Sequence, residues 1–75
     1  MATVRQFEVE RLDNARPHDE VELAIVRLVD CGFEKFIQID TYGRETREQP
    51  RKLSQTTRLD QAAFEKLVEL GRSHF

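Results

Sequence analysis

Alternation of apolar and polar side chains predicts two strands in the middle of the chain. Residues 33–42 place Ile37, Ile39 and Thr41 on one side, and a more polar set on the other, namely Phe36, Gln38, Asp40 and Tyr42. Because the side chains of a strand point alternately to its two faces, we expect the isoleucines to face the core. Residues 52–59 alternate in the same way, with Leu53 and Leu59 at the ends of the side expected to face inward.

The first third of the chain gives a weaker pattern. Residues 3–11 alternate charged and apolar side chains, which predicts a half-buried strand with Phe7 and Val9 inward. Residues 20–29 fit two readings, since their apolar residues have helical spacing but several are β-branched. We favour a strand that turns through residues 30–32 into the next strand, and a helix is the alternative.

The spacing near the end of the chain predicts a helix over residues 61–70. Asp60 is a good N-cap, and Leu59 and Phe64 have the spacing of a hydrophobic staple. Gly71 stands where a left-handed C-cap belongs. The apolar stripe of this helix consists of Ala63, Phe64, Leu67 and Leu70.

The predicted order is therefore β-β-β-β-α, an α+β fold with a four-stranded antiparallel sheet and one C-terminal helix in a single domain, residues 1–75. One helix covers one face of such a sheet, so the other face stays open for a ligand or a second subunit. A chain of 75 residues has little room for a core, and its single cysteine cannot form an internal disulfide. We therefore expect a homodimer.

Charge and composition narrow the class of protein. The net charge is −2, yet residues 43–59 carry five basic and two acidic side chains. Residues 1–15 lack the apolar run of a signal peptide, and no run is long enough to cross a bilayer. A single cysteine without a disulfide framework suits a reducing compartment, so a cytoplasmic location is expected, with no membrane partner.

The basic segment lies beside the polar side of the predicted strand 33–42. Proteins that bind single-stranded nucleic acid use cations to follow the phosphates and flat rings on which bases stack. The ring candidates are Phe36 and Tyr42, and the phosphate contacts are expected from Arg44, Arg47, Arg51, Lys52 and Arg58. The alternative is a solvated loop on a small module or inhibitor that binds another protein through a sheet edge or its acidic surface.

A longer stretch of the chain resembles a known family. It contains, in order, the run from Ile37 to Tyr42, a polar loop, Arg51-Lys52, a Ser-bearing strand and a helix that begins after Asp60. This succession resembles the positive-cofactor-four family of single-stranded-DNA-binding transcriptional coactivators. The chain departs from the family in lacking glycines around Arg51-Lys52 and in having a longer strand after them. The resemblance implies a homodimer joined partly through its helices and a role as a DNA-binding accessory factor in transcription or replication, with DNA favoured over RNA.

The same residues do not predict catalysis. Asp40 has no second carboxylate or histidine at a spacing that would pair with it, so a cross-strand ion pair with Lys52 or Arg58 is expected instead. His18, His74 and Cys31 stand apart from one another, which predicts no metal site and no cofactor. We therefore expect a binding protein and not an enzyme.

Overall fold

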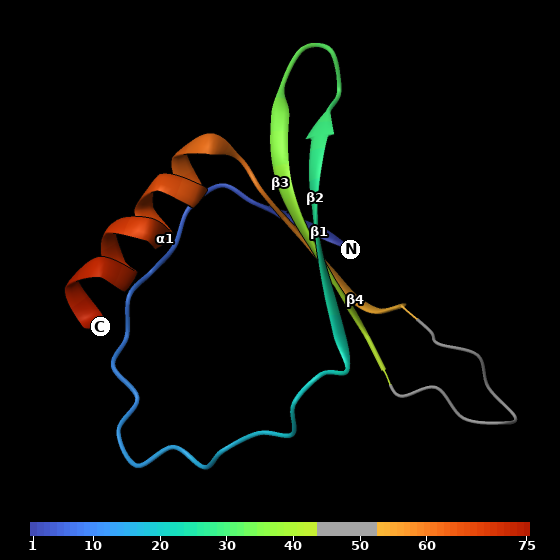
Figure 1. The fold of residues 1–75 in the computed structure, drawn as a ribbon. Coiled ribbons are helices and arrows are strands. Elements are labelled where there is room, and N and C mark those ends of the chain that lie inside the picture. The colour runs from blue at the N-terminus through green and yellow to red at the C-terminus, as the bar shows by residue number, and fades with distance from the viewer. Residues whose placement is uncertain (44–52) are drawn as a thin grey trace, which may run out of the picture.

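The computed structural model describes residues 1–43 and 53–75 as a four-stranded sheet followed by one helix, an α+β fold (Figure 1). The elements are β1 (Ala2–Val4), β2 (Leu23–Asp30), β3 (Lys35–Tyr42), β4 (Leu53–Leu59) and α1 (Gln61–His74). The predicted order of four strands and a C-terminal helix is confirmed. Within the described residues, no helix combines the length and the apolar character needed to cross a bilayer.

The sheet is mixed, so the expectation of a purely antiparallel sheet was wrong. The strand order is β1-β4-β3-β2, with β2 and β4 antiparallel to β3. β1 instead runs parallel to β4, and Ala2 lies opposite Thr57. The strand predicted over residues 3–11 ends at Val4, and Val9 is exposed. A short parallel pairing with a strand so distant in sequence leaves no trace in the local alternation.

The segment over residues 20–29 resolves in favour of a strand, and β2 and β3 form a hairpin. The backbone N–H of Cys31 donates to the carbonyl of Glu34 at 2.9 Å, and the N–H of Gly32 donates to the Asp30 carboxylate at 2.8 Å. Gly32 has φ +89°, which a residue without Cβ adopts without strain. The hairpin register then places Arg27 opposite Gln38.

Helix α1 begins as predicted and ends later. The Asp60 side chain accepts a hydrogen bond from the N–H of Ala63 at 2.8 Å, which confirms the N-cap. The predicted stop at Gly71 was wrong, because the helix runs to His74 with Phe75 as its C-cap. No proline follows Gly71, and a glycine in helical conformation costs only about 1 kcal/mol relative to alanine.

The two faces of the sheet differ in character. Residues opposite each other in a ladder share a face, so the register defines two surfaces. The polar face carries Arg27, Phe36, Gln38, Asp40, Tyr42, Thr56 and Arg58, together with the half-buried Leu23, Ile25 and Val29 of β2. The apolar face carries Val26, Leu28, Ile37, Ile39 and Leu59.

Burial is distributed differently from the prediction. The isoleucines of β3 are only half-buried, whereas Phe36 and Asp40 on the polar face are buried. Within the described residues, the buried apolar side chains are Phe36, Leu59 and Ala63. The helix thus covers only part of the apolar face, and the face expected to stay open for a ligand is the one filled by interacting side chains.

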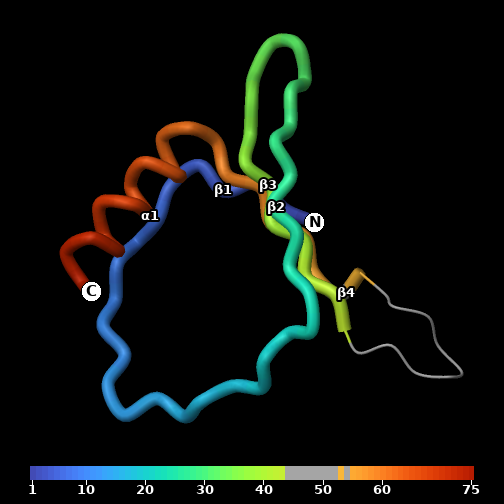
Figure 2. The backbone as a smooth tube through the Cα atoms, viewed as in Figure 1, coloured from blue at the N-terminus to red at the C-terminus, as the bar shows by residue number. Residues whose placement is uncertain are grey.

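The molecule is flat and open. Its extents are 42 × 41 × 17 Å, and the helix projects away from the sheet and does not lie flat along it (Figure 1, Figure 2). The radius of gyration is 14.9 Å, compared with about 11 Å for a compact domain of this length. Residues 5–22 form neither helix nor strand and are exposed apart from Phe7.

Candidate nucleic-acid interface

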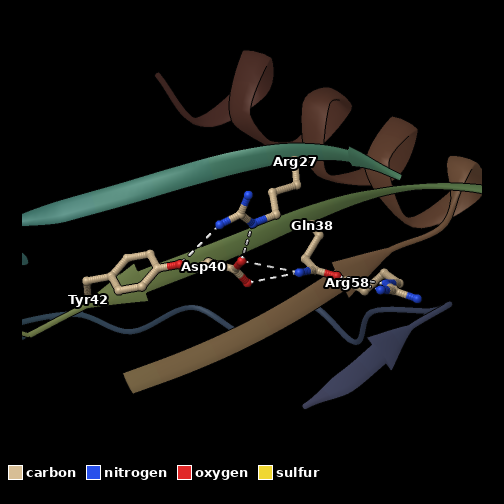
Figure 3. A network of polar contacts seen from close by, with 5 residues as sticks. All are labelled: Arg27, Gln38, Asp40, Tyr42 and Arg58. Atoms are coloured by element: carbon tan, nitrogen blue, oxygen red, sulfur yellow. Dashed lines mark hydrogen bonds and ion pairs between the residues drawn. The ribbon is translucent and has the colours of Figure 1, made fainter. Parts of the chain in front are cut away.

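The polar face is built from alternate residues of three strands. Gln38, Asp40 and Tyr42 come from β3, Arg27 comes from β2 and Arg58 from β4, so that both arginines flank the central strand (Figure 3). The arrangement follows from the ladder register, in which Gln38 lies opposite both arginines. A row of polar groups and one ring therefore runs along β3 between two cations.

Asp40 is the centre of this row. Its carboxylate accepts a hydrogen bond from Nε of Arg27 at 2.7 Å, and the amide nitrogen of Gln38 donates to it at 3.1 Å. The pKa of Asp40 lies below its usual value, chiefly because Arg27 donates to the ionised form, with further help from Gln38. Partial desolvation acts in the opposite direction and is the weaker effect. Asp40 is therefore charged at neutral pH and holds Arg27 in place.

Gln38 connects Asp40 to Arg58, which lies on the same face on the neighbouring strand β4. Its amide oxygen accepts from two nitrogens of Arg58, at 3.0 and 2.6 Å. The guanidinium of Arg58 lies over the ring of Phe36, 5.3 Å from its centroid, and that of Arg5 lies 5.8 Å from the same centroid. Both distances suit a cation–π interaction. Phe36 is consequently buried beneath two cations and presents little free ring surface.

The two cations over Phe36 differ in their charge partners. Arg5 forms ion pairs with Glu34 at 2.9 Å and Asp60 at 3.1 Å, which raise its pKa above the ordinary value. Arg58 is held by the neutral amide of Gln38 and has no carboxylate partner among residues 1–43 and 53–75. The positive charge of Arg58 is thus the less neutralised of the two.

Tyr42 ends the row at the side from which the chain leaves β3. Its hydroxyl accepts a hydrogen bond from the Arg27 guanidinium at 3.2 Å, and its ring is half-buried. The ladder shifts register between Thr41 and Tyr42, which sets Tyr42 opposite Leu53 at the start of β4. The Tyr42 ring is therefore steadied by one arginine, with part of its surface accessible.

Three of the seven predicted interface residues come together on this face, namely Phe36, Tyr42 and Arg58. The other four, Arg44, Arg47, Arg51 and Lys52, lie outside the described residues. Of the two partners expected for Asp40, Arg58 was wrong, because it binds Gln38, and Lys52 lies outside the described residues. Arg27 of β2 makes an ion pair with Asp40. Asp40 pairs with an arginine of β2 because the hairpin register places Arg27 opposite Gln38, which is two residues from Asp40 on the same face.

Sequence reasoning missed two arginines of this face. Arg27 interrupts an apolar run, and it shares strand parity with Leu23 and Ile25 on the side facing the polar residues of β3. Once the turn at residues 31–34 is known, the register follows and would have placed Arg27 beside Asp40. Arg5 carries no such signal, because its position depends on the parallel pairing of β1 with β4.

This face offers positive charge, hydrogen-bond donors and a ring surface to a ligand. Among the described residues, no three potential ligand side chains gather where they could hold a metal ion. No family model, curated protein or solved structure matches the chain. The features of this face that bear on function are its guanidinium groups, the amide of Gln38 that joins them, and the partly accessible ring of Tyr42.

Proposed function

We propose that the protein binds single-stranded nucleic acid, DNA in preference to RNA, with little dependence on base sequence. The ligand lies along the polar face and over the connection between β3 and β4. Phosphates contact Arg58 and the cations of the basic segment, namely Arg44, Arg47, Arg51 and Lys52. One base stacks on Tyr42. Such binding suits an accessory factor in transcription or replication, and it requires no cofactor and no enzymatic step.

The observation that carries this proposal is that Tyr42 and Arg58 lie on the same face of the sheet. Both lie on the side of the sheet that Asp40 and Gln38 organise, and Tyr42 is the last residue of β3 before the basic segment. Single-strand binding needs a ring and cations within one groove or face, and base stacking on such a ring contributes roughly 1–3 kcal/mol. The arrangement meets both needs with side chains already positioned by hydrogen bonds.

Phe36 has a different role in this proposal. Its ring is covered by the guanidinium groups of Arg5 and Arg58, so it supports the cations from below and does not stack on a base. Arg58 donates from Nε and Nη2 to Gln38, which leaves Nη1 to bind a phosphate. Phe36 thereby presents Arg58 to the ligand.

The test is a fluorescence-anisotropy titration of a labelled single-stranded oligonucleotide at several salt concentrations. Arg58→Gln removes one cation and leaves a side chain that can still reach Gln38. We expect it to weaken binding and to reduce the slope of log K against log salt by about 0.7, the value of one phosphate contact on a single strand. Replacing Arg44, Arg47, Arg51 and Lys52 together with Gln should remove most of the affinity.

Tyr42→Ala is the matched test of stacking. It should lower affinity and leave the salt slope unchanged, because stacking releases no counterions. Arg11→Gln is the control, since Arg11 is an exposed cation on residues 5–22 that pairs locally with Asp13. A parent protein with no affinity for any single strand at low salt would exclude the proposal.

A second candidate function rests on the edge of the sheet. Among residues 1–43 and 53–75, β2 has a strand on only one side, and it is eight residues long. Such an edge can accept an extended peptide as a further strand. The protein would then be an interaction module or inhibitor without a nucleic-acid role, and the titration separates the two, because this candidate predicts no oligonucleotide binding.

A further inference from the structure

An open groove lies between the hairpin of β2 and β3 and the start of α1. β4 pairs with β3 only as far as Ile37, so the tip of the hairpin extends past β4, and α1 leaves the sheet at the same end (Figure 1). The groove has a volume of about 850 Å³ and is lined by Leu28, Ile37, Leu59 and Phe64 among others. The sheet therefore forms one wall of the groove, and the helix forms the other.

The apolar side chains along the groove are exposed. Leu28 is 83% exposed, and Phe33 at the tip of the hairpin lines the groove and is 88% exposed. Exposed apolar residues continue beyond the groove on both walls, to Val26 on the same face of β2 and to Leu67, about one turn along α1 from Phe64. A ligand that covers all of them must be longer than the groove, which favours a segment of a protein over a small molecule.

The shape of the two walls suits a helix. α1 covers the apolar face near the buried Leu59, and the part of that face around Leu28 has no cover within the described residues. A second helix, about 10 Å in diameter, would contact both walls there and extend the helical layer over the sheet. A strand added beside β2 would lie in the plane of the sheet, and Leu28 would stay uncovered because its side chain points out of that plane.

Acids outnumber bases around the groove. The ionised side chains of its lining are Asp30, Glu34, Lys35 and Asp60. Arg5 is bonded to two of these acids, Glu34 at 2.9 Å and Asp60 at 3.1 Å, so it compensates one of their two charges. Lys35 lies opposite Asp30 in the ladder and offsets that charge. The lining and its arginine together therefore keep one negative charge.

A further acid lies at the rim on the helix side. Gln61 lines the groove and donates to the carboxylate of Glu65 at 3.1 Å. Glu65 follows the exposed Phe64 directly along α1. A basic segment complements these charges, whereas a second copy of the chain would bring identical acids against them.

We propose that the groove between the hairpin and α1 binds an amphipathic helix of a partner protein. The apolar side of that helix packs on Leu28, Phe33 and Phe64, and its basic side chains lie toward Asp30 and Glu65. Recognition of this kind is read through apolar residues spaced three and four apart on the bound helix. The helix lies on the apolar face, so the inference does not rest on nucleic-acid binding by the polar face.

A synthetic helix is the probe, labelled and titrated with the full chain by fluorescence anisotropy. It has about 18 residues, with leucines along one side and lysines elsewhere, a length at which an isolated helix is only partly formed. We expect saturable binding and, by circular dichroism, more helix in the mixture than in the two components apart. Binding without a gain of helix would indicate a strand added at the edge of β2 and would overturn the proposal.

Two matched peptides separate the apolar contribution from the charged one. The first has the same composition in an order that forms no apolar side, and the second has glutamate in place of every lysine. Each should bind at least about tenfold more weakly than the lysine peptide, the effect expected when a central apolar or charged contact is lost. Equal affinity of either peptide would contradict the proposed partner.

The variant Leu28→Thr locates the site. Because Leu28 is exposed in the chain alone, the urea midpoint should stay at the parent value, while the dissociation constant of the lysine peptide rises at least about tenfold. Leu12→Thr is the matched control, since Leu12 is 80% exposed and lies outside the groove. Phe33→Ser repeats the test at the hairpin tip if the change in β2 lowers the midpoint. Variants of Leu28 and Phe33 that bind like the control would exclude this groove.

Asp30→Asn tests the charge. Asparagine keeps the oxygen that accepts from the N–H of Gly32 at 2.8 Å, so the turn is preserved. The dissociation constant of the lysine peptide should rise about threefold, and its dependence on salt should become shallower. A salt dependence identical to that of the parent would count against the acidic rim.

Light scattering and oligonucleotide titration separate this inference from other outcomes. A parent mass of two chains that falls to one chain in Leu28→Thr would mean that a second copy fills the groove, and the proposal would fail. Leu28→Thr should bind oligonucleotide as the parent does, because the residue lies on the apolar face. Failure of nucleic-acid binding in both proteins would leave the peptide result unaffected.

Discussion

The two faces of the sheet are ordered by different means. On the polar face, a buried carboxylate holds an arginine from β2 and an amide from β3, and the amide holds an arginine from β4. On the apolar face, Leu59 is buried beside the helix, while Leu28 at the other side of the sheet is almost fully exposed. The polar groups of one face are hydrogen-bonded to one another, whereas the apolar side chains of the other face are buried only near the helix.

The two kinds of contact contribute differently, since polar contacts determine which side chains lie together and apolar burial supplies the free energy of folding. Hydrogen-bonded charges fix which side chains lie together but contribute little net stability, because desolvation offsets most of their attraction. Apolar burial supplies most of the free energy of folding, and here three buried apolar side chains are found among the described residues. The hydrogen-bonded groups thus fix which side chains of the polar face lie together, whereas buried apolar side chains stabilise both faces, Phe36 on the polar face and Leu59 on the apolar face.

The largest expected effect comes from the apolar face. Leu59→Ala removes a buried side chain at the junction of β4 and α1, and should lower the free energy of unfolding by about 2–5 kcal/mol. Urea denaturation followed by circular dichroism measures this loss. Leu53→Ala, at the exposed start of the same strand, is the control and should cost less than about 1 kcal/mol. Similar losses for the two variants would mean that Leu59 is not central to the core.

A smaller effect is expected from Asp40→Asn on the polar face. The variant keeps the size of the side chain but removes the charge that holds Arg27, so the urea midpoint should fall. The fall should be less than for Leu59→Ala, because the Arg27 side chain is 48% exposed and regains water. An unchanged midpoint would show that the ion pair contributes nothing to folding.

The same pair predicts a pH dependence. The pKa of Asp40 is lowered in the folded protein, so its contribution is fully present above the unfolded value of 3.8 and is lost as the pH falls through the folded value. The free energy of unfolding of the parent should therefore decrease more steeply in acid than that of Asp40→Asn. Parallel pH profiles for the two proteins would contradict this assignment.

The smallest loss of stability is expected from changes at Asp60, the residue between β4 and α1. Asp60 caps α1 with one carboxylate oxygen and accepts from Arg5 with the other. Asp60→Ala should cost about 1 kcal/mol through loss of the cap. Asp60→Asn retains the capping oxygen and weakens the ion pair, so it should cost less. If the two variants lose the same stability, Arg5 contributes more than the cap does.

Much of the fold could be predicted because local patterns of apolar and polar residues indicate its longer strands and its helix. The alternation around Ile37 and Ile39 predicted β3, and Asp60 predicted the first turn of α1. The length of β1 could not be predicted, since alternation continues past Val4 where no strand pairs with it. The end of α1 was missed because Gly71 stops a helix only when it adopts a left-handed conformation.

The candidate site was predicted less well than the fold. Phe36, Tyr42 and Arg58 were placed on one side by strand parity alone, and this holds in the register of the sheet. The burial of Phe36 could not be foreseen, because it results from two arginines that come from β4 and from the residues after β1. Strand parity reports which face a residue occupies, and only the tertiary structure reports what covers it.

The parallel pairing of β1 with β4 has a consequence for the order in which the chain folds. Ala2 lies opposite Thr57, so the chain between these two residues must be enclosed as a loop before this edge of the sheet can close. The hairpin of β2 and β3 needs only a short loop and has no such delay. Contacts of large sequence separation form slowly. The β1 amides should therefore be the last to gain protection in a refolding hydrogen-exchange experiment, well after those of the hairpin.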